Sequence, residues 1–419
     1  MTGSAFEPLW DIVEEHLDEA EFLWEQWESS LVAPNYLLRE VANGPEARLM
    51  AHLDGLVVNG PQVVECLLVP TIADVDAEPT RVRAAALALL QTPGEGGVAT
   101  VLAELHASPP QRPELVRALE CCGERGPWAE SLGPLLAADD VDLRHAAARV
   151  LAFHGEMLGD VAPRMLASDR GVDRALGLGL VPRLAGGSRL VREVVAALTS
   201  DDPALRDVAL TAGAGLDLPQ AWREARDLAV GGDPTAGQAL LLLALRGAPE
   251  DRPVIAAALA AESLRGAALW ALGFLGTVEA VDLAIPWLED TDYGRLAGEV
   301  VAAVTGLDLE NENLTRTPEE DPALEHRPED DLPLPDAIGV LTWWQTRRAR
   351  FTSDRRYVAG SPRESTRLLS ALEEGPMRRR TAHLIALRMG GARVPYVEVM
   401  APSSRQRREL AALRAALTR

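Results

Sequence analysis

Residues 139–155, which read DDVDLRHAAARVLAFHG, contain a dense group of side chains that could perform chemistry. Three aspartates, two arginines and two histidines lie within one stretch of helical pattern. Imidazole and carboxylate groups this close together can act as general acid and base, or can bind a metal ion. They can equally belong to a repeated structural unit, and the rest of the chain favours that second interpretation.

Other reactive arrangements are scarce in the sequence. No HExxH, CxxC or GxSxG motif occurs, and all 41 basic residues are arginine, so neither a Schiff-base lysine nor a phosphate-loop lysine is available. Of the three cysteines, Cys121 and Cys122 lie in an apolar helical stretch, where thiols behave as small hydrophobic groups. We therefore expect no enzyme activity, no cofactor and no metal site.

The helical pattern around Arg144 recurs along the chain. A polar anchor is followed by small and aliphatic residues at three- and four-residue spacing and then by a closing glycine, which is typical of a helix with one buried face. Acidic residues, proline and serine precede the anchor, as in TSDDPALR, and these residues favour helix starts. Successive anchors are 27 to 35 residues apart, at Arg48, Arg83, Arg117, Arg144, Arg174, Arg206, Gln238, Arg265 and Arg295, with a further copy at Arg380.

A unit of about thirty residues accommodates one pair of helices and resembles a short HEAT repeat. One pair cannot bury its own apolar face, so neighbouring pairs must stack. The sequence therefore predicts an all-α protein, an α-solenoid of HEAT-like helix pairs over residues 46–306. Arg144 is expected to pair with an acid such as Asp142 or with a neighbouring copy, or to bridge loop carbonyls between repeats, whereas His145 and His154 have no counterparts in other copies and look incidental.

Three segments depart from the repeat. Residues 1–45 are strongly acidic and contain Trp10, Trp24 and Trp27, which suits an N-terminal helical cap. Residues 307–337 are rich in acid and proline without helical periodicity, which predicts a loop or linker. Residues 338–419 form an arginine-rich helical C-terminal part.

The C-terminal part reverses the charge of the chain. Seventeen arginines and six acids lie between positions 346 and 419, so this part carries +11, whereas the net charge of −22 leaves −33 for the remainder. Aromatic side chains among arginines can bind nucleic acid, or can dock onto an acidic protein surface of the same or another chain. The second interpretation is favoured because acidic surface is abundant. The candidate protein-binding residues are Trp343, Trp344, Arg347, Arg348, Arg350, Arg355, Arg356, Tyr357, Arg405, Arg407 and Arg408.

Several segments near the two ends resemble a known group of proteins. EEHLDEAEFLWEQW and RLMAHLDGLVV near the N-terminus, then LTWWQTRRARF, RRYVAGSP, RRRTAHLIALRMGG and VEVMAPSSRQRREL, are similar in that order to an uncharacterised bacterial family of HEAT-repeat-like proteins. Genes of that family often lie beside type VI secretion genes. The resemblance implies a helical-repeat fold, a bacterial origin and a secretion context, and it carries over no catalytic residues.

These observations favour a non-catalytic protein-binding scaffold or adaptor, whose partner in a secretion setting would be an apparatus component or an effector that it carries. Two alternatives stay open. An immunity protein would use acidic surface against a basic toxin, and a nucleic-acid-binding solenoid would use the arginine-rich C-terminal part. An excess of acid argues against nucleic acid as the partner. The N-terminus lacks the basic start and apolar core of a secretory signal, and no apolar run is long enough to span a bilayer, so we expect a cytoplasmic protein without a membrane partner.

Overall fold

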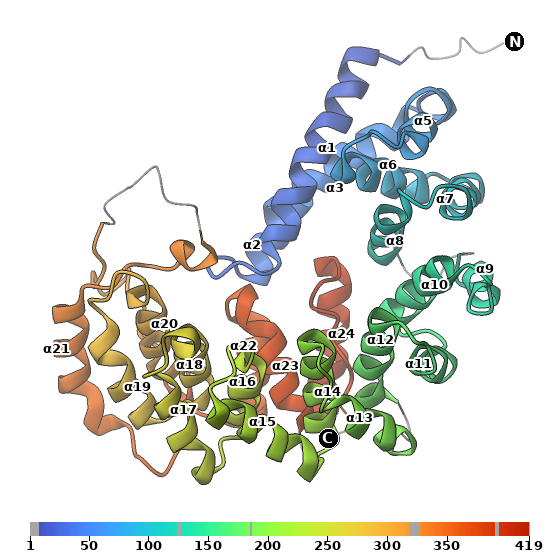
Figure 1. Cartoon of the computed structure of the whole chain (residues 1–419). Helices are drawn as coiled ribbons and strands as arrows, with labels where there is room; N and C mark the ends of the chain where they lie inside the picture. The colour runs from blue at the N-terminus through green and yellow to red at the C-terminus, as the bar shows by residue number, and fades with distance from the viewer. Residues whose placement is uncertain (1–7, 124–127, 185–186, 318–326, 390–393, 419) are drawn as a thin grey trace, which may run out of the picture. The chain divides into compact units, whose positions relative to one another are not determined.

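The chain folds almost entirely into helices (Figure 1). The computed structural model describes residues 8–123, 128–184, 187–317, 327–389 and 394–418, and helices make up 72% of the structure. Two short strands, β1 (Tyr357–Val358) and β2 (Ser361–Pro362), pair antiparallel, with Tyr357 opposite Pro362. The all-α class expected from the sequence is confirmed.

The structure divides into two compact units. The first unit comprises Met1–Leu31, Leu38–Leu180 and Glu398–Arg408, and the second comprises Val32–Leu37, Val181–Val397 and Glu409–Arg419. The division near residue 180 falls within the predicted repeat region, away from the expected segment boundaries at residues 45, 306 and 337. Those boundaries follow changes in composition, whereas the units follow contacts made in three dimensions.

In the first unit, alternate helices pack into two layers. Helix α6 contacts α1, α3 and α8, and α10 contacts α8 and α12, while the intervening helices pack alongside them. The elements of this unit are α1 (Trp10–Ser30), α2 (Leu38–Asn43), α3 (Pro45–Val58), α4 (Pro61–Val63), the π-helix η1 (Val64–Leu68), α5 (Val69–Ala73), α6 (Pro79–Gln91), α7 (Gly96–Ala107), α8 (Arg112–Cys121), α9 (Trp128–Leu135), α10 (Val141–His154), α11 (Leu158–Leu166) and α12 (Gly171–Leu180).

The second unit repeats this layering and adds C-terminal helices. Helices α14, α16, α18 and α20 pack in succession, and α23 lies against α14 and α16 (Figure 1). The α-helices are α13 (Val191–Ala197), α14 (Pro203–Gly215), α15 (Pro219–Gly231), α16 (Gly237–Arg246), α17 (Arg252–Ala258), α18 (Glu262–Leu275), α19 (Val278–Ala284), α20 (Gly294–Thr305), α21 (Ala337–Arg347), α22 (Ser365–Glu374) and α23 (Arg380–Arg388). Helix α24 (Ser403–Leu417) begins in the first unit and ends in the second. Short 3-10 helices are η2 (Val181–Arg183), η3 (Gly187–Leu190), η4 (Pro249–Asp251), η5 (Ile285–Trp287), η6 (Pro328–Asp331), η7 (Arg348–Arg350) and η8 (Met377–Arg379).

The predicted helix caps are present in part: aspartates cap α10 and α14, whereas Glu78 before α6 forms no side-chain cap. The Asp140 carboxylate accepts hydrogen bonds from the backbone N–H groups of Asp142 (2.9 Å) and Leu143 (3.1 Å) at the start of α10. Closing glycines in the left-handed conformation end helices α10, α15, α16, α18 and α20. These caps explain why the repeated sequence pattern breaks into separate short helices.

The stretch of residues 139–155, rich in acids, arginines and histidines, is structural. Arg144 donates a hydrogen bond to the carbonyl oxygen of Ala138 (2.8 Å), so it does contact a loop carbonyl, but in the loop before its own helix and not between repeats. His145 lies 2.6 Å from Oδ1 of the fully buried Asp173, and His154 lies 2.9 Å from the carbonyl oxygen of Leu119. The expectation that these two histidines are incidental is therefore wrong, because each holds a polar group of a neighbouring helix.

The described part of the acidic segment 307–337 is partly ordered against the helices. Leu307, Leu309 and Leu332 are buried, and Thr315 pairs with Pro335 in an isolated β-bridge. Residues 318–326 of the predicted loop lie outside the described residues.

Among the described residues, no single helix has both the length and the apolar character needed to cross a bilayer. The pair Leu38–Val58 and Pro61–Ala73, which is bent by 101°, meets both criteria only when its two helices are taken together.

A buried carboxylate on α3 anchors the start of α24 within the first unit. Glu46 is 8% exposed and accepts a hydrogen bond from the indole N–H of Trp27 (3.0 Å). It also accepts from the backbone N–H of Ser403 (2.9 Å) and from the Ser403 hydroxyl (2.6 Å). One side chain therefore satisfies three donors from α1 and from the N-terminus of α24, where a negative charge is favourable.

Replacing this carboxylate should destabilise the fold. Glu46→Ala leaves buried donors without an acceptor, so we expect the free energy of unfolding to fall by about 2 to 4 kcal/mol. Glu65→Ala, which removes an exposed acid, should change it by less than about 0.5 kcal/mol. Urea denaturation of the two variants and the wild type measures both effects, and equal losses would contradict the anchoring role.

Candidate functional site

The first part of the predicted arginine–tryptophan cluster docks onto α19. Trp344 is buried and its indole N–H donates to Oδ1 of Asp282 (2.9 Å). Arg348 binds the same carboxylate through two nitrogens, Nε to Oδ1 at 3.0 Å and Nη2 to Oδ2 at 2.6 Å. The expected docking of a basic segment onto an acid of the same chain occurs here, and these side chains fix one side of α21.

The second part of the cluster forms a strap along the ends of three helices. We define the strap as residues 356–360. Its backbone N–H groups donate to carbonyl oxygens near the helix ends: Tyr357 to Gly276 (2.6 Å), Ala359 to Ala303 (2.7 Å) and Gly360 to Val304 (3.0 Å). At Gly276 and Gly306, both with positive φ, an added Cβ would clash with backbone atoms of the strap. Glycine is required at both positions for the strap to approach.

Arg356 satisfies the carbonyl groups at the ends of α16 and α18. Its guanidinium donates to the carbonyl oxygens of Ala244 (2.5 Å), Leu245 (3.1 Å) and Arg246 (3.1 Å) on α16, and of Phe274 (3.0 Å) and Leu275 (2.8 Å) on α18. Burial, together with the charges of Arg363 and Arg252, lowers the pKa of Arg356 to about 9. The side chain is still charged at neutral pH, and five carbonyl dipoles surround its charge.

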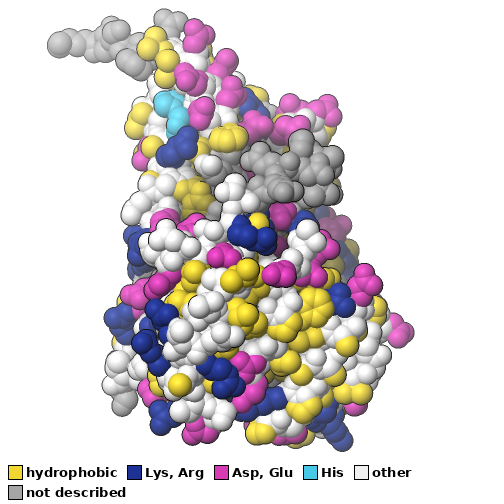
Figure 2. Space-filling model, turned by 90° about the vertical axis from the view of Figure 1, so that its left-hand side faces the viewer, with side chains coloured by type: hydrophobic (Ala, Val, Ile, Leu, Met, Phe, Trp, Pro, Cys, Tyr) yellow, Lys and Arg dark blue, Asp and Glu magenta, His cyan; other side chains and the backbone are white. Residues whose placement is uncertain are grey.

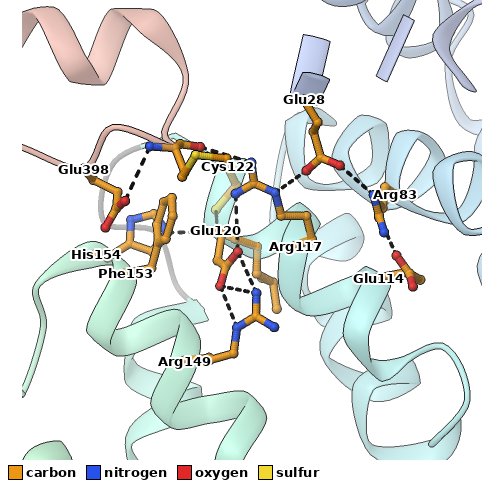
Figure 3. Close-up of polar contacts among 12 residues, drawn as sticks. Glu28, Arg83, Glu114, Arg117, Glu120, Cys122, Arg149, Phe153, His154 and Glu398 are labelled. Carbon is orange, nitrogen blue, oxygen red and sulfur yellow. Dashed lines mark hydrogen bonds and ion pairs between the residues drawn. The ribbon is translucent and has the colours of Figure 1, made fainter. Parts of the chain in front are cut away.

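In the first unit, arginines and glutamates alternate in a connected series across four helices (Figure 3). Glu28 on α1 accepts from Arg83 on α6 (2.6 Å) and from Arg117 on α8 (2.5 Å). Glu120 on α8 accepts from Arg117 (3.3 Å) and from Arg149 on α10 (3.0 Å). Glu114 on α8 completes the series by accepting a hydrogen bond from Arg83. We call this series the charge ladder.

The charge ladder is balanced and is a structural element. Its three arginines and three glutamates cancel, and Arg117 also donates to the carbonyl oxygen of Met400 (3.0 Å). Arg405, one of the predicted binding residues, is used in the same region: it donates to the carbonyl oxygen of Phe153 (2.7 Å) and lies 4.9 Å from the centroid of that ring. Each charge of the ladder therefore has at least one partner of opposite sign.

The neighbouring thiols are inert. Burial raises the pKa of Cys121 and of Cys122 to about 12, so both remain protonated at neutral pH and are poor nucleophiles. Within the described ranges, no group of three or more His, Cys, Asp or Glu side chains is arranged to hold a metal ion.

Several predicted residues lie at the surface. Arg350, Arg355, Arg407 and Arg408 are exposed, while Trp343 is half-buried under the guanidinium of Arg347, 4.8 Å from its ring centroid. The structure engages Trp344, Arg348, Arg356, Tyr357 and Arg405 in contacts within the chain. Partner binding by the cluster stays a prediction.

Sequence reasoning missed an apolar face on α21. We define the α21 face as Ile338, Leu341, Thr342 and Gln345, which all lie on the exposed side of the helix. Ile338 is 72% exposed and Leu341 is 37% exposed. Figure 2 views the molecule from the side on which α21 lies, and hydrophobic side chains gather in the lower part of that view. The signal in the sequence was two aliphatic residues three positions apart on the side of α21 away from its buried residues.

Removing the Arg356 guanidinium should destabilise the second unit. Arg356→Gln leaves several carbonyl groups without donors, and we expect a loss of about 2 to 4 kcal/mol in the free energy of unfolding. Its exposed neighbour provides the matched control, because Arg355→Gln removes the same charge and should cost less than about 0.5 kcal/mol. Chemical denaturation that gave equal midpoints for the two variants would contradict the capping role.

The Asp282 contacts predict an acid-dependent contribution to stability. Although burial acts to raise the pKa of Asp282, hydrogen bonds from Arg348 and Trp344 lower it below the ordinary value of 3.8. The stabilisation is therefore present above pH 3.8 and is lost as the pH falls through the lower folded-state pKa. Asp282→Asn should reduce stability at about pH 6 by about 1 kcal/mol or less, and this difference should shrink towards about pH 3. Thermal melts across that range test this, and a constant difference would argue against it.

Comparison with known proteins assigns no family to the chain. No family model matches it, and a search of curated proteins finds no match. An engineered protein whose crystal structure was solved by the Northeast Structural Genomics Consortium aligns over 90% of this chain and 98% of its own, with 16% sequence identity and a TM-score of 0.33. A likeness at that score carries no argument about fold or function.

Proposed function

We propose that the protein is a non-catalytic protein-binding scaffold or adaptor built from HEAT-like helix pairs that stack as α-solenoid segments. The α21 face carries this proposal. Large aliphatic side chains on an exposed helix are costly to leave in water, and such a patch next to charged residues is typical of a protein-binding surface. Another side of α21 is held by Trp344 and Arg348, so the face is presented on a rigid helix.

The chemistry of the face indicates the partner. Arg350 is exposed directly after α21, and Arg355 is exposed a few residues later. A partner with apolar side chains flanked by carboxylates would bury Ile338 and Leu341 and pair with these arginines. A type VI secretion component as that partner is part of the proposal and rests on the sequence resemblance alone.

A second candidate function has its own observation. Helix α1 exposes Asp11, Glu14, Glu15 and Asp18 together with Phe22, which is 61% exposed. An acidic face with an exposed aromatic side chain suits a basic protein ligand, as an immunity protein against a basic toxin would need. The nucleic-acid alternative is weaker, because Arg348, Arg356 and Arg405 are already committed to contacts within the chain.

The α21 face can be tested with one double variant. Crosslinking and affinity capture from the source organism should recover a specific partner with the wild type. The double variant Ile338→Asp/Leu341→Asp should reduce recovery of that partner by about tenfold or more, because a hot spot of this kind contributes about 1 to 2 kcal/mol or more to binding. Val230→Asp, at a site 69% exposed on α15, is the matched control and should retain the partner. A partner recovered equally by all three proteins would overturn the role of α21, and one lost only when the α1 acids are neutralised would favour the immunity function.

A further inference from the structure

The second unit contains a cavity of about 430 Å³ with mixed walls. It lies between α18, α20, the strap and α22, and the start of α23 completes it. Apolar lining comes from Phe274, Ala302, Leu309, Val358 and Leu368. This volume is in the range of sites that hold a small organic molecule.

Four arginines line this cavity, and Arg363 is the least compensated of them. Arg295 and Arg379 each lie within ion-pair distance of an acid, and Arg367 donates to two carbonyl oxygens of the strap. Arg363 donates one hydrogen bond to the carbonyl oxygen of Leu245 (3.2 Å), and no carboxylate pairs with it among the residues that the structure describes. Burial also lowers the pKa of Arg363.

His383 adds a second polar group at the wall of the cavity. It lines the cavity, is only 5% exposed and packs edge-on against Phe274, with ring centroids 5.4 Å apart. Its Nδ1 is buried without a hydrogen-bond partner among the described residues. An unsatisfied buried nitrogen costs folding free energy, and a ligand oxygen would remove that cost. Burial, with the charges of Arg379 and Arg363, lowers the pKa of His383 to about 3, so the ring is neutral and can donate only one hydrogen bond.

We propose that this cavity binds a small monocarboxylate with an apolar body, whose carboxylate pairs with Arg363 and accepts a hydrogen bond from His383. One poorly compensated buried cation matches one negative charge, so a dianionic phosphate is disfavoured. The acids Asp308, Glu310 and Glu374 are exposed lining residues, and they would repel a ligand that carries further negative charge. The apolar walls would cover an aryl or acyl body.

Binding of 4-phenylbutyrate to the full chain tests the proposal. Its neutral isostere, 4-phenylbutyramide, keeps the apolar body without the charge. We expect calorimetry to show that the acid binds about tenfold or more tightly than the amide, and that Arg363→Gln removes this preference. Arg192→Gln removes an exposed arginine of the same unit outside the cavity lining and should bind like the wild type, while Ala302→Leu, which fills the cavity without changing charge, should weaken both ligands.

Four results would overturn the proposal. The first is equal affinity for the acid and the amide, and the second is unchanged binding of the acid by a folded Arg363→Gln or Ala302→Leu protein. The third is absence of binding up to about 1 mM, which corresponds to no more than a weak interaction. A peptide ending in a free carboxylate that binds where 4-phenylbutyrate does not would also overturn it, because the site would then serve a macromolecule. None of these outcomes affects the proposed role of the α21 face in partner binding, since that face lies outside the cavity lining.

Discussion

The carbonyl groups at helix ends are the constraint on which the structure depends. Each short helix leaves its last carbonyls without intrahelical donors, and a protein made of many short helices must satisfy them repeatedly. Here guanidinium groups do so: Arg265 reaches Leu259 at the end of α17, and Arg356 reaches five carbonyls at once. A planar guanidinium with five N–H donors can bridge separate peptides in a way that an ammonium cannot. The use of arginine for every basic residue suits this role.

Charge is balanced locally, although the chain as a whole is acidic. The charge ladder pairs Glu28 of α1 and Glu114 and Glu120 of α8 with arginines from neighbouring helices, so these helices are joined by ion pairs as well as by apolar packing. In the second unit, Arg348 and Arg379 bring the basic C-terminal part onto Asp282 and Glu299. The excess acid therefore lies mainly on the surface, where water solvates it, whereas Arg363, like Arg356 and Arg388, has carbonyl oxygens and no carboxylate as partners among the described residues.

The sequence predicted what depends on local pattern. Helix class, the acidic caps such as Asp140, the closing glycines at Gly247 and Gly276, and the contact of Arg144 with a loop carbonyl all follow from spacing within about ten residues. The pairings between residues far apart in the chain could not be predicted from the sequence. Nothing near Arg356 reveals that its partners lie on α16 and α18, and nothing near His383 indicates a cavity wall. The α21 face was missed for a different reason, since exposure of Ile338 depends on which side of the helix its neighbours cover.

The strap has a consequence for how the molecule is made. A ribosome releases α16, α18 and α20 well before residues 356–360 exist, so water must hydrate the ends of these helices during synthesis. Packing of the second unit can be completed only when the strap emerges and displaces that water. The order of translation is therefore part of the folding route, and the helix ends near Gly247 and Gly276 are among the last parts of this unit to mature.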